Sequence, residues 1–146
     1  MNIEKLALSI ASTLLLIFFS LILYGAYVKN IDLPTCIVNV KPFEKDTIIK
    51  ISENKYEIHY IARQFSFFPM EIKIPKGSTV DIYITSPDVL HGFHIEGTNV
   101  NLMVIPGAIT YYRAKFENPG EYRIYCHEYC GLGHQNMMGK IIVQWD

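Results

Sequence analysis

The sequence lacks an excess of charge of either sign. Its 146 residues contain 13 Lys and Arg against 14 Asp and Glu, which gives a formal net charge of −1. This balance gives no support for nucleic acid as a partner or for attraction to an anionic membrane surface. Internal repeats and low-complexity segments are also absent. The length suffices for one domain with an appendage, but not for two full domains.

Charged residues are missing altogether between Leu6 and Val28. As a helix this run would be about 34 Å long, enough to cross a hydrocarbon core of ~30 Å. A cleaved signal peptide would have a shorter apolar region and small residues before its cleavage site, where this chain has tyrosines. We therefore predict a retained membrane helix within residues 1–29. Lys5 and Lys29 flank the two ends, so charge does not decide the orientation.

The remainder of the chain predicts β-structure. Residues 30–46 are interpreted as a linker or docking segment, and residues 47–146 as one all-β domain. Short runs rich in Ile, Val, Tyr and Thr recur there every 8–12 residues, with turn residues between them. These runs are "TIIKIS", "YEIHYIAR", "EIKIP", "TVDIYIT", "NLMVI", "ITYYRAKF", "EYRIYC" and "KIIVQW". The pattern is typical of a Greek-key β-sandwich or barrel.

One loop between the last two predicted strands, "CHEYCGLGHQNMMG", concentrates metal-ligand side chains. Steps of four, four and three residues separate Cys126, Cys130, His134 and Met137, so these side chains can converge on one side of a compact loop. Thiolate, imidazole and thioether together favour copper, whereas a thioether is an uncommon ligand of zinc. A Cys126–Cys130 disulfide is the main alternative. It would restrain only a very short loop and would leave His134 and Met137 unexplained.

Two cysteines exceed the single cysteine of a mononuclear blue-copper site. Two bridging thiolates can hold two copper ions, and each ion then needs an imidazole. The loop supplies one well-placed histidine, His134, so another histidine must provide the second imidazole. The possible sources are His59, His91, His94 and His127. His91 and His94 are separated by an odd number of residues, which places them on opposite faces of a strand. Pro87 and Gly92 mark His91 as adjacent to a loop, and the sequence slightly favours it.

These residues resemble a known family. His91, followed at a distance by Cys-x-Glu-x-Cys-x-x-x-His-x-x-Met, resembles subunit II of cytochrome c oxidase, which carries the dinuclear copper centre CuA. The phrases "SPDVLHGFHIEGTN" and "PGEYRIYCHEYCGLGHQNMMG" are most similar to the B-type haem-copper oxidases of thermophiles. The resemblance covers roughly residues 60–146. It implies a cupredoxin fold, and a copper domain on the extracytoplasmic side of the cell membrane.

The resemblance also implies a ligand set for two copper ions. Cys126 and Cys130 would bridge both ions, His91 and Met137 would complete one, and His134 with the backbone carbonyl of Glu128 would complete the other. In many A-type relatives the carboxylate at the position of Glu128 also reaches a magnesium ion, so magnesium is a further expectation here. Asp88, three residues before His91, is expected to orient that imidazole or to form a turn.

The implied function is electron transfer. Cytochrome c would deliver electrons one at a time to the copper pair, and they would pass to haem in a separate subunit I, where oxygen is reduced to water and protons are pumped. The chain shows no haem-ligand pattern and should not reduce oxygen alone. Phe67 and Phe68, in "QFSFFP", are expected either to contact the electron donor or to pack in the core.

Two residues outside the copper loop also carry expectations. Glu4, beside Lys5, resembles the Glu-Lys pair at which B-type enzymes admit protons, although a charged helix end also has an ordinary solvation role. Cys36 is expected to be a free, buried thiol.

Three alternative functions are weighed against this interpretation. Nitrous oxide reductase carries the same copper centre, but it normally adds a large propeller domain. A membrane-tethered copper chaperone would favour exposed, exchangeable ligands. A quinol oxidase subunit would keep the fold and lose the copper ligands, all of which are present here.

Overall fold

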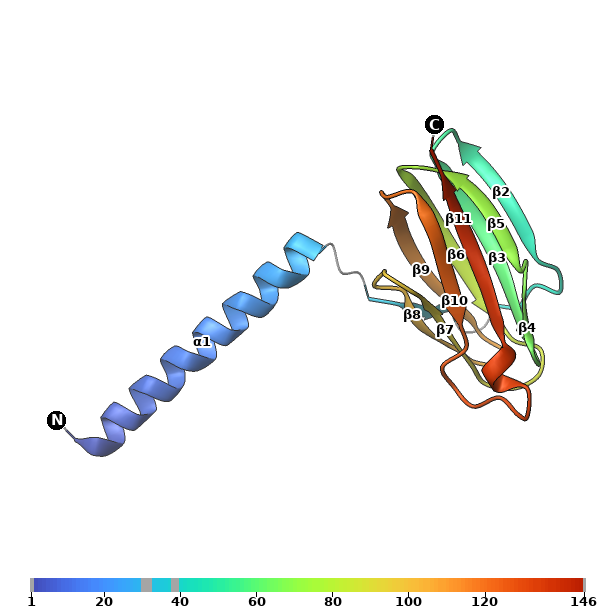
Figure 1. Ribbon diagram of the computed structural model, residues 1–146. Helices are drawn as coiled ribbons and strands as arrows, with labels where there is room; N and C mark the ends of the chain where they lie inside the picture. The colour runs from blue at the N-terminus through green and yellow to red at the C-terminus, as the bar shows by residue number, and fades with distance from the viewer. Residues whose placement is uncertain (1, 30–32, 38–39, 146) are drawn as a thin grey trace. The chain divides into compact units, whose positions relative to one another are not determined.

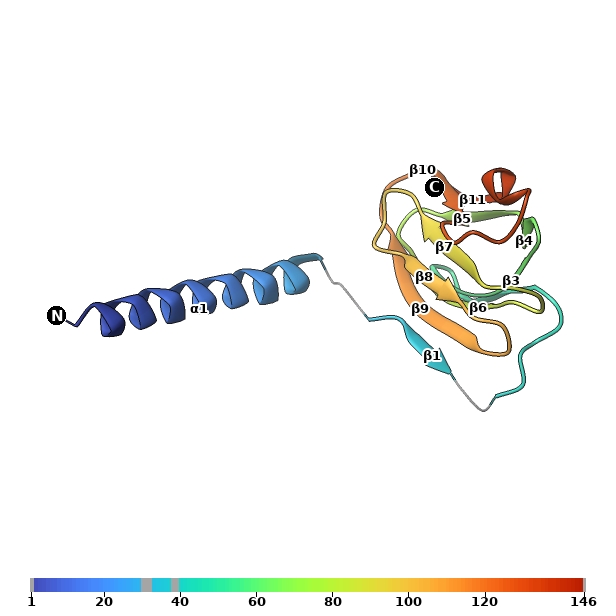
Figure 2. The same cartoon turned by 90° about the horizontal axis from the view of Figure 1, so that it is seen from below.

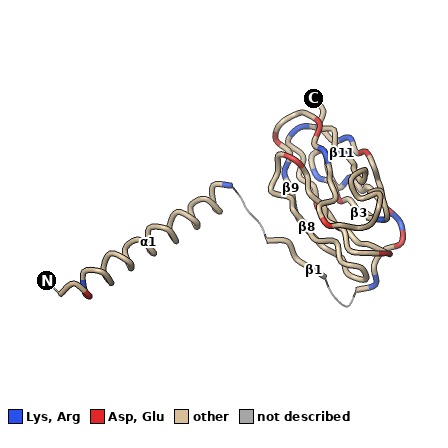
Figure 3. The backbone as a smooth tube through the Cα atoms, turned by 60° about the horizontal axis from the view of Figure 1, so that its bottom comes forward, with Lys and Arg blue, Asp and Glu red and all other residues tan. Residues whose placement is uncertain are grey.

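The computed structural model describes residues 2–29, 33–37 and 40–145, and the chain divides into two compact units, Met1–Asp32 and Leu33–Asp146. The first unit contains the helix α1 (Ile3–Lys29), which is long and apolar enough to cross a membrane. Figure 3 shows charged residues only at its two ends. Glu4 lies in the first turn and Lys29 in the last, so both charges complement the helix dipole. Thr13 and Ser20 donate their hydroxyl protons to carbonyls four residues earlier, at 2.8 Å.

The second unit is a sandwich of two β-sheets (Figures 1 and 2). The first sheet has the order β1-β9-β6-β3-β2, and β4 also pairs with β3; the second has the order β5-β11-β10-β7-β8. The strands of the first sheet are β1 (Thr35–Ile37), β2 (Thr47–Ser52), β3 (Lys55–Arg63), β4 (Ser66–Phe68), β6 (Ser78–Thr85) and β9 (Ile109–Phe116). Those of the second are β5 (Glu71–Pro75), β7 (His91–Ile95), β8 (Asn101–Val104), β10 (Gly120–Tyr125) and β11 (Met138–Gln144). The predicted all-β sandwich is confirmed.

The core lies between the two sheets, and it is formed by the buried residues that alternate with more exposed ones along the strands. In β5 and β11 every second residue is buried, as expected for strands with one face on a core. Toward one end of the core, the Phe93 ring contacts those of Tyr60 and Phe67, with ring centroids 5.0 and 5.3 Å away. All three aromatic side chains are fully buried. This cluster supports β7, the strand that begins with His91.

Several elements differ from the sequence-based expectations. Within the segment interpreted as a linker or docking region, residues 35–37 form β1 and pair antiparallel with β9. β4 was also not expected as a strand, because three residues give too little alternation to recognise. The segment of β7 was not among the predicted strand runs, and it was treated as a strand only when His91 and His94 were placed on opposite faces. Cys36, expected to be buried, is exposed, since β1 lies at the edge of its sheet.

An ion network on the first sheet leads to a test of stability. The buried Asp81 accepts hydrogen bonds from Arg113 Nε and Nη2, at 2.6 and 3.0 Å, and from the Tyr111 hydroxyl at 2.9 Å. Lys55 Nζ lies 3.8 Å away. Burial opposes ionisation of Asp81, but the hydrogen bonds from Arg113 and Tyr111 and the nearby positive charges outweigh it and lower the pKa of this carboxyl.

We expect Asp81→Asn to lower the free energy of unfolding by about 1–3 kcal/mol at pH 7, because hydrogen bonds to a charged group are lost. A lowered pKa contributes stability above the unfolded value of about 4, and that contribution disappears as the pH falls through the folded pKa. The difference between variant and wild type should therefore shrink below about pH 4. Urea denaturation of the unit 33–146 at several pH values measures it.

The control for this prediction is Glu117→Gln. Glu117 makes a comparable ion pair, 2.7 Å from Lys115 Nζ, but both side chains are exposed. Such surface pairs contribute little, so no measurable change is expected. A cost for Asp81→Asn that stays constant between pH 7 and pH 3 would contradict the role assigned to the Asp81 charge.

Candidate metal centre

The loop between β10 and β11 forms a compact site at one end of the sandwich (Figure 1). The Cys126 backbone N–H donates to the Met137 carbonyl at 3.3 Å, which brings the two ends of the loop together. A single 3₁₀ turn, η1 (His134–Asn136), lies just before β11. β7 pairs with β10 through Tyr125 and His94, and this pairing carries His91 to the loop from 35 residues upstream.

The ligand atoms of five side chains converge in this site. Cys126 Sγ and Cys130 Sγ are 3.8 Å apart. His91 Nδ1 lies 3.9 Å from Cys126 Sγ, whereas His134 Nδ1 lies 3.7 Å from Cys130 Sγ. Met137 Sδ is 3.7 Å from Cys130 Sγ. The two cysteine sulfur atoms therefore lie side by side, and each has a different imidazole beside it.

A backbone oxygen joins the side chains. The Cys126 thiol contacts the Glu128 carbonyl oxygen at 3.2 Å. The Glu128 carboxylate is directed elsewhere, because its Oε1 lies 3.6 Å from His127 Nδ1. Of Glu128, the carbonyl is therefore the group that belongs to the cluster.

The cluster fits a soft metal ion. His91, Cys126, Cys130 and Met137 are buried, and ligand atoms of the first three lie within 4.8 Å of one another. Burial, together with the neighbouring Cys126 thiol, raises the pKa of Cys130 to about 11. The 3.8 Å between the sulfur atoms is far longer than a disulfide bond of about 2.05 Å. A metal ion with bonds to sulfur of about 2.3 Å can contact both sulfurs.

Asp88 fixes the orientation of His91. The His91 Nε2–H donates to Asp88 Oδ1 at 2.8 Å, which leaves Nδ1 facing Cys126. The same carboxylate accepts hydrogen bonds from the Ser86 hydroxyl and from the backbone N–H groups of Gln64 and Val89. Burial opposes ionisation of Asp88, but these bonds, led by that from Gln64, outweigh it and lower the pKa of this carboxyl to about 2. Asp88 is thus held as a charged acceptor behind the imidazole.

The other histidines do not join the cluster. His94 lies on the opposite face of β7 and its Nδ1 is 3.0 Å from the Val100 carbonyl. His127 packs its ring over Gly92, where a Cβ would lie 2.5 Å from the imidazole Cγ. His59 contacts Glu57 on the first sheet, at 2.8 Å. Of the four histidines considered as the second imidazole, only His91 reaches the sulfurs.

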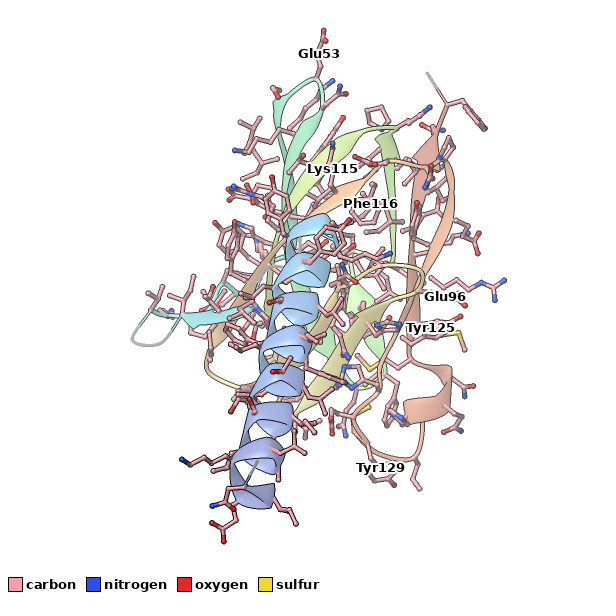
Figure 4. The ribbon with its side chains drawn as sticks, turned by 90° about the vertical axis from the view of Figure 1, so that its left-hand side faces the viewer. Glu53, Glu96, Lys115, Phe116, Tyr125 and Tyr129 are labelled. Atoms are coloured by element: carbon pink, nitrogen blue, oxygen red, sulfur yellow. The ribbon has the colours of Figure 1, made fainter. Side chains whose placement is uncertain are left out.

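The aromatic residues near the loop divide by alternation along β4. Phe67 is 0% exposed and packs against Phe93, so it has no surface to offer an electron donor, and the expectation of a docking role for it is corrected. Phe68 is 42% exposed. The sequence analysis did not single out Tyr129 and Leu132 as residues that could contact an electron donor. They are 75% and 89% exposed in the metal loop, and Figure 4 shows Tyr129 at its tip. Large apolar residues in a turn-rich loop were the available signal.

Comparison with known proteins identifies relatives. Residues 54–145 match the family model described as cytochrome c oxidase subunit II, periplasmic domain. A cytochrome c oxidase subunit 2 of Thermus thermophilus is 38% identical, with 97% of this chain and 91% of the relative covered. A second subunit 2 from Thermus thermophilus is 48% identical over 66% of this chain and 72% of the relative.

Similar solved structures agree with the family match. A chain in the cryo-EM structure of a heme-copper terminal oxidase dimer is 52% identical and has a TM-score of 0.86, with 98% of this chain and 100% of that chain covered. The periplasmic domain of cytochrome oxidase subunit II from Bradyrhizobium japonicum is 22% identical, with a TM-score of 0.57 over 62% of this chain and 84% of that one, and supports the cupredoxin-like fold alone. The chain belongs to the cytochrome c oxidase subunit II family.

Proposed function

We propose that the cluster holds a dinuclear copper centre. The observation that carries this proposal is the pair of buried sulfur atoms 3.8 Å apart, each with a separate imidazole beside it. The residues that would hold the two ions are Cys126 and Cys130, shared by both, His91 with Met137, and His134 with the carbonyl of Glu128. When bound, such a copper pair accepts and releases one electron that is shared between the two ions.

The protein's own part in electron transfer is to hold the copper ligands in fixed positions. Cys126 and Met137 directly adjoin β10 and β11, and His91 begins β7, so paired strands anchor these ligands. Burial excludes water from the sulfur atoms. Asp88 holds the His91 ring in one orientation. Because such outer contacts and the weak thioether ligand tune a copper site, the chain sets the reduction potential through Asp88 and Met137.

The chain is subunit II of a haem-copper terminal oxidase, where electrons from cytochrome c enter the enzyme. From the copper pair they would pass to haem in subunit I, the site of oxygen reduction coupled to proton pumping, and this chain alone would not reduce oxygen. Helix α1 would anchor the subunit in the cell membrane, surrounded by lipid, with the copper domain on the periplasmic side.

We propose an apolar docking surface for the cytochrome, made by Phe65, Phe68, Tyr129 and Leu132. All four are exposed, and they lie in the metal loop and in the β3–β4 segment. Residues 30–146 contain 11 Lys and Arg against 13 Asp and Glu, a balance that gives no strong steering by charge. Recognition should therefore depend on contact area more than on ionic strength.

Two acidic residues extend the proposal. The Glu128 carboxylate is partly exposed and faces away from the sulfur atoms, so it remains available for a magnesium ion, which the carboxylate at this position reaches in many A-type relatives. Glu4, in the first turn of α1, is proposed to take up protons for the oxidase. Glu4→Gln should then slow turnover while the copper spectra stay unchanged, and unchanged turnover would contradict the role.

Loading the full chain with copper in detergent tests the dinuclear proposal. We expect two copper ions per chain and a seven-line EPR pattern in the mixed-valence state, because the unpaired electron interacts with both nuclei. One copper per chain with a four-line spectrum would contradict the proposal. So would a Cys126–Cys130 disulfide in a fully metallated preparation.

A further inference from the structure

The turn that joins β3 to β4 lies against the metal loop. Gln64, in this turn, is 66 residues before Cys130, yet its side-chain Nε2–H donates to the Cys130 carbonyl oxygen. The backbone N–H of Gln64 donates to Asp88 Oδ2 at 2.8 Å. One residue therefore forms hydrogen bonds to two separate parts of the site.

The two bonded groups control different ligands. Cys130 Sγ lies within 3.8 Å of three other ligand atoms, those of Cys126, His134 and Met137, so the Cys130 backbone position affects most distances among the sulfur and nitrogen atoms. Asp88 holds the His91 imidazole through the 2.8 Å bond to Nε2. Gln64 thus links the part of the site built on the loop to the part built on β7.

Close packing accompanies these hydrogen bonds. A Cβ on Gly131 would lie 2.9 Å from Gln64 Nε2, and one on Gly133 would lie 2.5 Å from the Phe65 ring. Gly131 also has a φ of 131°, a conformation that favours glycine. The β3–β4 turn therefore packs directly against the backbone of the loop, and the loop cannot move toward the turn without a clash.

We propose that Gln64 is a positioning residue for the copper centre. It holds Cys130 through its side chain and His91 through Asp88, which keeps the two flanks of the copper pair at a fixed separation. This inference rests on the proposed copper site. It predicts effects on copper retention and on the electronic structure of the centre, whereas a hydrogen bond that only stabilises the fold would affect unfolding alone.

Gln64→Met in the full chain tests the proposal. Methionine has nearly the same length but no donor, and the backbone bond to Asp88 remains. Removing an outer partner of a metal ligand typically weakens metal binding 10–100-fold, so we expect about 10–100-fold weaker copper retention against a chelator. The EPR hyperfine splitting and the midpoint potential should also shift. Because Gln64 is exposed, the thermal midpoint of the copper-free chain should stay near that of wild type.

Two further variants sharpen the result. Gln64→Glu replaces the donor by an acceptor facing the Cys130 carbonyl, and should lose copper at least as readily as Gln64→Met. Gln135→Met makes the same chemical change at an exposed residue of the same loop, and should retain copper like wild type. Wild-type retention, hyperfine splitting and potential in Gln64→Met would overturn the positioning role, as would changes equal to those in Gln135→Met. Wild-type protein that fails to bind two copper ions would instead overturn the proposed copper centre.

Discussion

Cys130→Ser is expected to abolish the copper pair. Cys130 Sγ lies beside three other ligand atoms of the site, at 3.8 Å from Cys126 Sγ and 3.7 Å from both His134 Nδ1 and Met137 Sδ. A serine hydroxyl is a much harder ligand than a thiolate and poorly suited to soft copper. Copper content should fall to one ion per chain or less, with affinity reduced beyond the roughly 100-fold seen for outer partners. Metal analysis and EPR of the loaded chain measure this.

Cys36→Ser is the matched control, because it makes the same chemical change at an exposed thiol on β1. Its copper content and spectrum should equal those of wild type. Stopped-flow mixing with reduced cytochrome c adds a functional measurement, in which Cys130→Ser should show no rapid electron uptake. Two coppers and a seven-line spectrum in Cys130→Ser would show that Cys130 does not bridge the ions.

Phe93→Ala is expected to have the largest effect on stability. Phe93 is fully buried, and its ring contacts those of Tyr60 and Phe67. Phe→Ala in a core typically costs about 3–5 kcal/mol, because apolar contacts are lost and a cavity remains. Since Phe93 follows His91 by two residues on β7, copper retention should fall as well. Urea denaturation of the copper-free unit 33–146 gives the stability change.

Phe68→Ala supplies the comparison for this prediction. Phe68 is adjacent to Phe67 in the sequence but points outward from β4, and substitutions at such surface positions usually change stability by about 0.5 kcal/mol or less. Equal costs for the two variants would contradict the core assignment of Phe93. A slower reaction of Phe68→Ala with cytochrome c, at unchanged stability, would support the docking surface.

The most local features could be predicted from the sequence. An uncharged run longer than 20 residues is sufficient to predict α1, because length and apolar composition decide whether a helix can cross a membrane. The convergence of Cys126, Cys130, His134 and Met137 follows from their spacing in one short loop. Alternation along a strand also separated His91 from His94, which the structure places on opposite faces of β7.

Features that depend on contacts between distant segments could not be predicted. No local pattern shows that β7 lies beside β10, so the choice of His91 needed a family resemblance as well as strand geometry. Gln64 had no sequence signal at all, since its role arises from the position of the β3–β4 turn against the loop. Phe67 is different: β4 was not expected as a strand, and even in a known strand alternation directs one of two neighbouring phenylalanines inward without showing which one.

The position of β11 has a consequence for biosynthesis. β11 pairs with β10 on one side and, in parallel, with β5 on the other, and it begins immediately after Met137. During translation every proposed copper ligand is therefore made before the strand that closes the loop against the sheet. A nascent chain that has reached Met138 contains a complete set of ligands but no preformed cavity. We therefore expect copper to bind after β11 has been synthesised and has paired with β10 and β5, because these pairings close the loop.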